Sequence, residues 1–164
     1  MRPTDTLPLL IGAVVTAAVL VASASQSKPV KEEPIVGTWQ LDVARSRYRP
    51  GPGPVSETRT YKRGPNGIEG TILRKFASGR SDRIEYVAEY DREYPVSGTE
   101  DYDHILLKRI DERTAEAVLS HAGRVYGTAR RVIAPSGTRM TITLRRETAS
   151  GDVVMNTAVY EKVQ

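Results

Sequence analysis

Cysteine is absent from the 164 residues of the chain, which excludes a disulfide framework and a thiolate metal site. Long runs of one charge are absent as well. The 24 basic and 20 acidic residues leave a net charge of +4 and are dispersed along the sequence. Dispersed charge is typical of a solvated surface, and no basic run interleaved with aromatic residues indicates a nucleic-acid partner.

Groups that carry catalysis are also few. The two histidines, His104 and His121, have no third histidine, no helical His pair and no Gly-x-Ser-x-Gly motif to work with. His104 lies close to an acidic cluster formed by Glu100, Asp101 and Asp103, which lacks the ligand spacing of a calcium-binding loop. We therefore expect a surface histidine beside a solvated loop, and no enzyme, no metal and no cofactor.

The N-terminus carries the longest hydrophobic run. Arg2 precedes an apolar stretch from Leu7 to Ala22, and Ala22-Ser23-Ala24 supplies a small-x-small cleavage pattern. This order predicts a signal peptide over residues 1–24 and an exported protein, periplasmic or secreted. The alternative is an uncleaved anchor in the inner membrane, because the run is just long enough to span a bilayer and Asp5 offsets the single arginine.

The remainder divides into a short connector and one domain. Residues 25–34, with the sequence SQSKPVKEEP, are polar and charged and predict a flexible linker. Residues 35–164 have the length of a single domain. We expect membrane contact only through the N-terminal segment.

The pattern from residue 55 onward predicts β-structure throughout. Turn signals such as Gly64-Pro65-Asn66-Gly67 and Pro135-Ser136-Gly137 recur at spacings of about 8–12 residues. Between them, residues alternate with period two, as half-buried strands do. The alternating sets are Ile68, Gly70, Ile72 and Phe76; Ile84, Tyr86, Ala88 and Tyr90; Ala115, Ala117 and Leu119; Met140, Ile142 and Leu144; and Val153, Met155 and Val159 opposite Asn156, Ala158, Tyr160 and Lys162.

These runs predict an all-β fold with little helix. The expected architecture is an antiparallel up-and-down barrel of about 8–10 strands, because closing the sheet into a barrel removes its exposed edges. The first strand is expected around Trp39, within Val36–Val43. A single helical turn is expected over Ala44–Tyr48. The three prolines within residues 50–54 predict a connector that cannot lie inside a sheet.

Four blocks resemble a known family: Val36–Ser46, Tyr90–Gly98, Leu107–Asp111 and Ala158–Lys162. The family consists of small exported bacterial proteins described as hypothetical or lipocalin-like. It is similar at one remove to lipocalins and fatty-acid-binding proteins, whose first strand also opens with Gly-x-Trp. The resemblance implies an antiparallel barrel with an interior site and no established activity.

Aromatic side chains are candidates to line that interior. Trp39, Tyr61, Phe76, Tyr86 and Tyr90 have the flat apolar surfaces that an apolar ligand contacts. The alternative is that these residues are core. In that case Trp39 fills one end of the barrel and its indole N–H donates to a backbone carbonyl.

In four of the runs an arginine falls on the same face of the expected strand as the apolar residues. These arginines are Arg59, Arg74, Arg109 and Arg131. Arginines inside a barrel bind a carboxylate or phosphate bidentately. The alternative is that they lie at strand ends and extend to the rim, or that a bulge shifts the register. The predicted ligand-binding residues are Trp39, Tyr61, Phe76, Tyr86, Arg74 and Arg109.

We therefore expect a barrel that binds a small hydrophobic or anionic amphiphilic ligand, such as a fatty acid. The alternative is a barrel filled by its own side chains, which serves as a structural or protein-interaction module of the cell envelope. A cavity of about 300 Å³ or more favours the first hypothesis.

Overall fold

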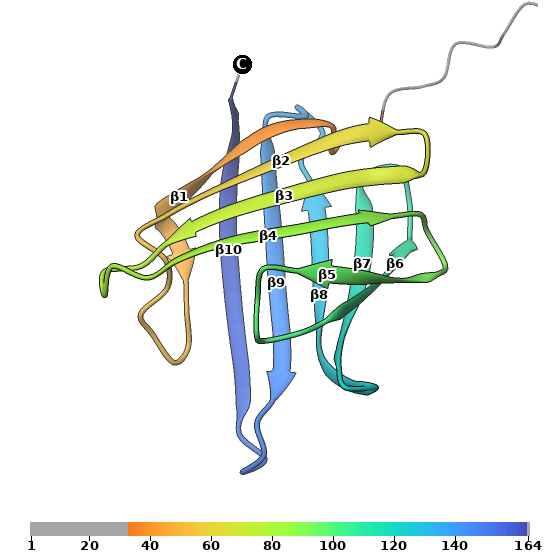
Figure 1. Ribbon diagram of the computed structural model, residues 1–164. Helices are drawn as coiled ribbons and strands as arrows, with labels where there is room; N and C mark the ends of the chain where they lie inside the picture. The colour runs from red at the N-terminus through yellow and green to blue at the C-terminus, as the bar shows by residue number, and fades with distance from the viewer. Residues whose placement is uncertain (1–32, 164) are drawn as a thin grey trace, which may run out of the picture. The chain divides into compact units, whose positions relative to one another are not determined.

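The computed structural model describes residues 33–163, which form a closed barrel of ten antiparallel strands (Figure 1). The strands are β1 (Gly37–Arg47), β2 (Ser56–Gly64), β3 (Gly67–Lys75), β4 (Ser81–Ala88), β5 (Glu93–Ser97), β6 (His104–Arg109), β7 (Thr114–His121), β8 (Arg124–Ile133), β9 (Arg139–Glu147) and β10 (Val153–Val163). Within this part of the chain no helix is long and apolar enough to cross a bilayer. The predicted signal peptide or anchor (1–24) and residues 25–32 of the predicted linker lie outside the described residues.

Each strand pairs with the next along the chain, and β1 pairs with β10 to close the barrel. In Figure 1, β2–β4 cross in front of β8–β10, so the two halves of the sheet enclose an interior between them. The predicted all-β, antiparallel, up-and-down barrel is confirmed. The proline-containing connector between β1 and β2 lies outside the strands, as expected.

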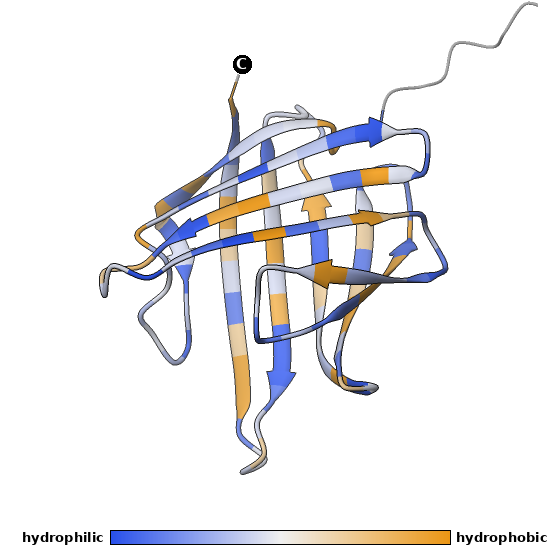
Figure 2. Ribbon diagram, viewed as in Figure 1, coloured by the Kyte–Doolittle hydropathy of each residue, from blue (hydrophilic) through white to orange (hydrophobic). Residues whose placement is uncertain are grey.

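Period-two alternation sets which side chains face inward. Figure 2 shows apolar and polar residues alternating along β9, where Met140 is fully buried. The alternation predicted for β10 is correct, but its apolar set, Val153, Met155 and Val159, does not face inward. Val153 and Met155 are about half exposed, at 51% and 48%, whereas Tyr160 is fully buried. Pairing of Tyr160 with Leu41 fixes this register, and a shift of one residue would exchange the two faces.

The helical turn predicted over Ala44–Tyr48 is wrong, because β1 continues to Arg47. The strand bulges between Asp42 and Arg47, where the pairing with β10 changes register. The Ser46 hydroxyl stabilises the bulge: it donates to the Asp42 carbonyl over 2.7 Å and accepts from the Val159 N–H over 3.0 Å. A bulge of this kind increases strand twist without forming helix.

One end of the barrel is filled by a core around Trp39, and we call it the closed end. Trp39 is completely buried, and its indole N–H donates to the Ile35 carbonyl over 2.8 Å. Ile35, Met140 and Tyr160 belong to the same buried cluster. The opposite end, where β1 ends and β2 begins, is the mouth of the barrel.

Glu33 closes the same end from outside the first strand. Its carboxylate is almost fully buried and accepts hydrogen bonds from Arg63 over 3.0 Å, from the Tyr90 hydroxyl over 3.1 Å and from Arg109. A buried carboxylate needs such donors to offset its lost hydration. Glu33, which the composition of the segment assigned to the linker, therefore belongs to the barrel.

Candidate functional site

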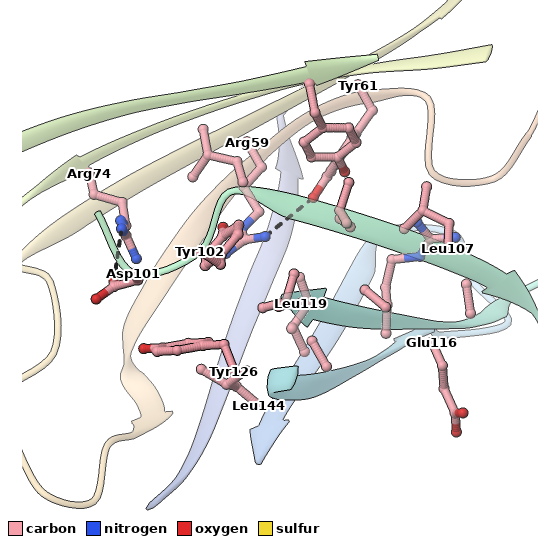
Figure 3. Close-up of a pocket in the computed structure, with 18 residues that line it drawn as sticks. Arg59, Tyr61, Arg74, Asp101, Tyr102, Leu107, Glu116, Leu119, Tyr126 and Leu144 are labelled. Carbon is pink, nitrogen blue, oxygen red and sulfur yellow. Dashed lines mark hydrogen bonds and ion pairs between the residues drawn. The ribbon is translucent and has the colours of Figure 1, made fainter. Parts of the chain in front are cut away.

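A cavity of about 130 Å³ lies inside the barrel between the closed end and the mouth (Figure 3). Its walls are mostly apolar. They include Ile72, Ile105, Leu107, Leu119, Ile142 and Leu144. Three alanines of β7 and β8, at positions 115, 117 and 129, also line it, and their short side chains leave the space open. Figure 3 shows Glu116 directed away from this space, and Glu116 instead pairs with Arg130 over 2.7 Å.

Arg59 projects into the interior from β2 and is balanced by a buried carboxylate. Its Nε donates to Glu57 and, over 3.0 Å, to the Tyr160 hydroxyl, and its Nη1 lies 3.4 Å from the Tyr61 hydroxyl (Figure 3). The Tyr160 hydroxyl in turn donates to Glu57 over 2.7 Å. Burial lowers the pKa of Arg59, but Glu57 and the two tyrosines raise it, and the net shift is upward. Arg59 therefore stays charged and its charge is compensated.

Arg74 lies at the mouth end of the cavity on β3. Its Nη2 donates to Asp82 Oδ2 over 2.8 Å and lies 4.0 Å from Asp101, the contact drawn in Figure 3. Its Nε is buried and has no hydrogen-bond partner among the described residues. Arg74 therefore keeps one donor unused beside a carboxylate that balances its charge.

Of the three arginines that line the inner cavity, Arg131 is the one without a carboxylate partner within residues 33–163. Its Nη2 lies 3.4 Å from the Tyr90 hydroxyl, and its buried Nε has no partner in the described part of the chain. Tyr86 lines the same cavity. Burial raises the pKa of Tyr86 and Tyr61 adds to the rise, while Arg131 lowers it. The positive charge of Arg131 thus faces neutral phenols.

The cavity brings together three of the six predicted site residues, Tyr61, Tyr86 and Arg74. Phe76 lies at the mouth instead, with the Arg80 guanidinium 4.1 Å from its ring centroid. Arg109 lies at the closed end, half-exposed, over the Tyr90 ring at 4.4 Å and paired with Glu33.

Trp39, the sixth predicted residue, fills the closed end and does not line the cavity. Its placement is the one expected of a core tryptophan whose indole N–H donates to a backbone carbonyl. The other two arginines that share the inward parity, Arg59 and Arg131, do line the cavity.

The interior side chains that were not predicted include Glu57, Tyr102, Tyr126 and Tyr160. Glu57 shares its parity with Arg59 and Tyr61, so alternation along β2 was a usable signal. Tyr160 likewise lies on the inward parity of β10. Tyr102 comes from the loop between β5 and β6 and lies 5.9 Å from the Tyr126 ring, centroid to centroid. A loop residue of this kind leaves no periodic signal in the sequence.

A second pocket of about 230 Å³ forms the mouth. It shares six lining residues with the inner cavity: Arg59, Arg74, Asp101, Tyr126, Ile142 and Leu144. The inner cavity alone is smaller than the roughly 300 Å³ typical of ligand pockets. A ligand larger than the inner cavity would therefore extend into the mouth.

The acidic cluster near His104 is held by local hydrogen bonds. Asp103 accepts from His104 Nδ1 over 2.9 Å and from the Ala122 N–H over 2.9 Å. The bond to Asp103 raises the pKa of His104, whose side chain is about half-exposed. No group of three or more acidic or histidine side chains in residues 33–163 is placed to hold a metal ion.

Comparison with known proteins adds one structural likeness. No protein-family model and no curated protein matches the sequence. The crystal structure of zebrafish ileal bile acid-binding protein with cholic acid is similar, with a TM-score of 0.53 and 10% identity. The likeness covers 79% of this chain and 99% of that chain. At this identity the likeness shows the fold, which is the closed antiparallel barrel of lipocalin-like and fatty-acid-binding proteins.

Proposed function

We propose that the barrel binds a small anionic amphiphile, with the acid group against Arg131 and the apolar part in the cavity. The observation that carries this proposal is the Arg131 Nε, a buried donor at the cavity that has no partner among the described residues. A buried donor left unpaired costs about 1–3 kcal/mol. A carboxylate or similar acid would accept from it and also balance its charge.

The other three candidate arginines are already compensated. Arg59 pairs with Glu57, Arg74 with Asp82, and Arg109 with Glu33. An acid group placed at any of these would compete with a carboxylate that already holds the guanidinium. Arg131 therefore sets the position of the head group, and a single negative charge matches it.

The apolar walls give the ligand its direction. Leu119 and Leu144 line the cavity on the strand halves nearer the mouth, whereas Arg131 lies near the closed end of β8. An acid at Arg131 therefore directs an apolar chain toward the mouth. The bile acid-binding protein was solved with cholic acid, which supports a barrel of this architecture as a binder of amphiphiles.

The test is calorimetric titration of the full chain with decanoate and with decanol. We expect decanoate to bind and decanol to bind more weakly, because decanol lacks the charge that Arg131 meets. Arg131→Met should weaken decanoate roughly 10- to 100-fold, the value of a charge-assisted hydrogen bond. Arg139→Met is the matched control, since Arg139 is half-exposed and pairs with Glu161 on β10. Equal affinity of wild type and Arg131→Met would refute the proposed site.

A second candidate function is a filled barrel that serves as a structural or protein-interaction module. The observation that favours it is the small inner cavity, about 130 Å³. A chain that binds neither fatty acids nor hydrophobic fluorescent probes would support this candidate. Binding of decanoate with the expected loss in Arg131→Met would exclude it as the sole role.

We also propose that the barrel acts outside the cytoplasm, from the hydrophobic run and small-residue pattern of residues 1–24. The test is fractionation of cells that express the full chain, with the mass of the mature protein. Loss of the segment up to Ala24 supports export with cleavage. An intact mass in the membrane fraction supports the anchor, and an intact mass in the cytoplasm contradicts both.

A further inference from the structure

The mouth of the barrel holds two buried polar groups without partners. The Tyr48 hydroxyl and the Arg74 Nε are both buried, both line the mouth pocket, and neither has a hydrogen-bond partner within the described residues. The connector between β1 and β2 holds Tyr48 in place, since a Cβ at Gly53 would collide with its ring. Burial and the nearby Glu57 raise the pKa of Tyr48 to about 12, against smaller lowering contributions from Arg59, Arg74 and a side-chain contact with Ser46, so its hydroxyl stays protonated.

Four arginines and three carboxylates surround this pocket. Arg146 lies 5.3 Å from the Tyr126 ring centroid and has no carboxylate partner within residues 33–163, whereas the other three arginines are paired. Arg74 and Arg80 both contact Asp82, and Arg59 contacts Glu57. Asp101 also lines the pocket and lies 4.0 Å from Arg74. Beside the Arg74 Nε a second full negative charge would meet Asp82 and Asp101, whereas an uncharged oxygen would accept from the two free donors without that repulsion.

We propose that the mouth pocket binds an uncharged oxygen, a hydroxyl or carbonyl, on the tail of the ligand, with Tyr48 and Arg74 as its donors. This inference rests on the proposed function, because it assumes an acid group at Arg131. The ligand class is therefore an oxygenated amphiphile: an acid at one end, an apolar middle, and a neutral oxygen far from the acid.

The strand register places Arg74 nearer the mouth than Tyr86. Tyr86, which lines the cavity with Arg131, pairs with Gly70, and Arg74 lies four residues further along β3. Four residues are about 13 Å measured along β3, at about 3.3 Å per residue. A medium-length chain covers this length of strand, so one ligand can reach from the cavity at Tyr86 to the mouth at Arg74.

The experiment compares decanoate, 10-hydroxydecanoate and decanedioate by calorimetric titration of the full chain. The hydroxy acid should bind wild type roughly two- to tenfold more tightly than decanoate, the value of one net hydrogen bond. Tyr48→Phe should reduce that preference, because only the Arg74 Nε is left as a donor. Tyr126→Phe removes a hydroxyl from the same pocket and should keep the preference. Decanedioate should not bind more tightly than the hydroxy acid.

The outcomes separate this inference from the function on which it rests. Equal binding of decanoate and the hydroxy acid to wild type would overturn the mouth site and leave the Arg131 site standing. A preference that is undiminished in Tyr48→Phe would overturn the assignment of Tyr48 as a donor. Tighter binding of the diacid than of the hydroxy acid would overturn the assignment of a neutral oxygen. Failure of decanoate and the hydroxy acid to bind would refute the proposed function and this inference together.

Discussion

The Tyr160 hydroxyl donates to Glu57 Oε1 over 2.7 Å, inside the barrel and between the two strands that flank β1. Glu57 also accepts from Arg59, so one carboxylate joins β2 to β10 and balances an internal cation. This arrangement leaves Arg59 compensated and directs the proposed acid group to Arg131 instead.

Tyr160→Phe should lower the free energy of unfolding by about 1.5–3 kcal/mol, because it removes a buried hydrogen bond to a charged group. Urea denaturation measures the change. Tyr102→Phe is the control, since Tyr102 is partly buried but its hydroxyl makes no hydrogen bond within residues 33–163, and should change stability by less than about 0.5 kcal/mol. Similar losses in the two variants would contradict a specific role for the Tyr160–Glu57 bond.

Glu33→Gln should destabilise the barrel by about 1–3 kcal/mol, because it leaves donors from Arg63, Arg109 and Tyr90 around a group without charge. Glu161→Gln is the matched control. Glu161 also pairs with two arginines, but it is 40% exposed, so its removal should cost less than about 1 kcal/mol. Equal urea midpoints for Glu33→Gln and wild type would show that Glu33 is not part of the folded unit.

Gly70→Ala should reduce decanoate binding, because the added Cβ would lie 2.5 Å from Tyr86 Cζ and force that ring to move in the cavity wall. Overpacking of this kind costs about 1–3 kcal/mol, which thermal unfolding would register. Gly51→Ala meets only the Tyr48 carbonyl oxygen, at 3.7 Å, and serves as the control. Wild-type affinity and stability in Gly70→Ala would mean that Tyr86 does not limit the cavity.

The fold could be predicted because period-two alternation is a local signal. The positions of Ile84 and Met140 within their own runs already indicate that their side chains are buried, as the structure shows. The inward face of β10 could not be predicted, because both faces of the strand carry apolar residues. Only the pairing with β1 determines that the face with Tyr160 is the buried one. The bulge at Ser46 was missed for a related reason, since its hydroxyl bonds to a strand distant in sequence.

The candidate site shows the same limit. Parity identified four inward or rim arginines, but only Arg59 has its carboxylate partner, Glu57, on the same strand. Glu33 reaches Arg109 from 76 positions away, and Asp82 meets Arg74 across a hairpin. The sequence pattern therefore does not show which arginine lacks a carboxylate partner, because the pairing is set by the folded barrel.

Asp103 and His104 should titrate as a pair. The Ala122 N–H and the His104 ring lower the pKa of Asp103, and Asp103 raises that of His104. The His104 contribution to stability is present below the imidazole's unfolded pKa and is lost as pH rises through the raised value. The Asp103 contribution is present above its unfolded pKa and is lost as pH falls through the lowered value.

Proton NMR titration of His104 measures this directly. We expect a pKa above the ordinary value of 6.5 in wild type and a return toward it in Asp103→Asn. An unchanged His104 titration in Asp103→Asn would contradict the pairing.

The most direct test of the central claim is ¹³C NMR of carboxyl-labelled decanoate bound to the full chain, followed as a function of pH. If the acid group lies against Arg131, its bound resonance should titrate well below the range of a carboxylate in water, because the guanidinium favours the charged form. The same measurement on Arg131→Met should lose that shift. A bound carboxylate that titrates as it does in water would place the head group in solvent and contradict the account.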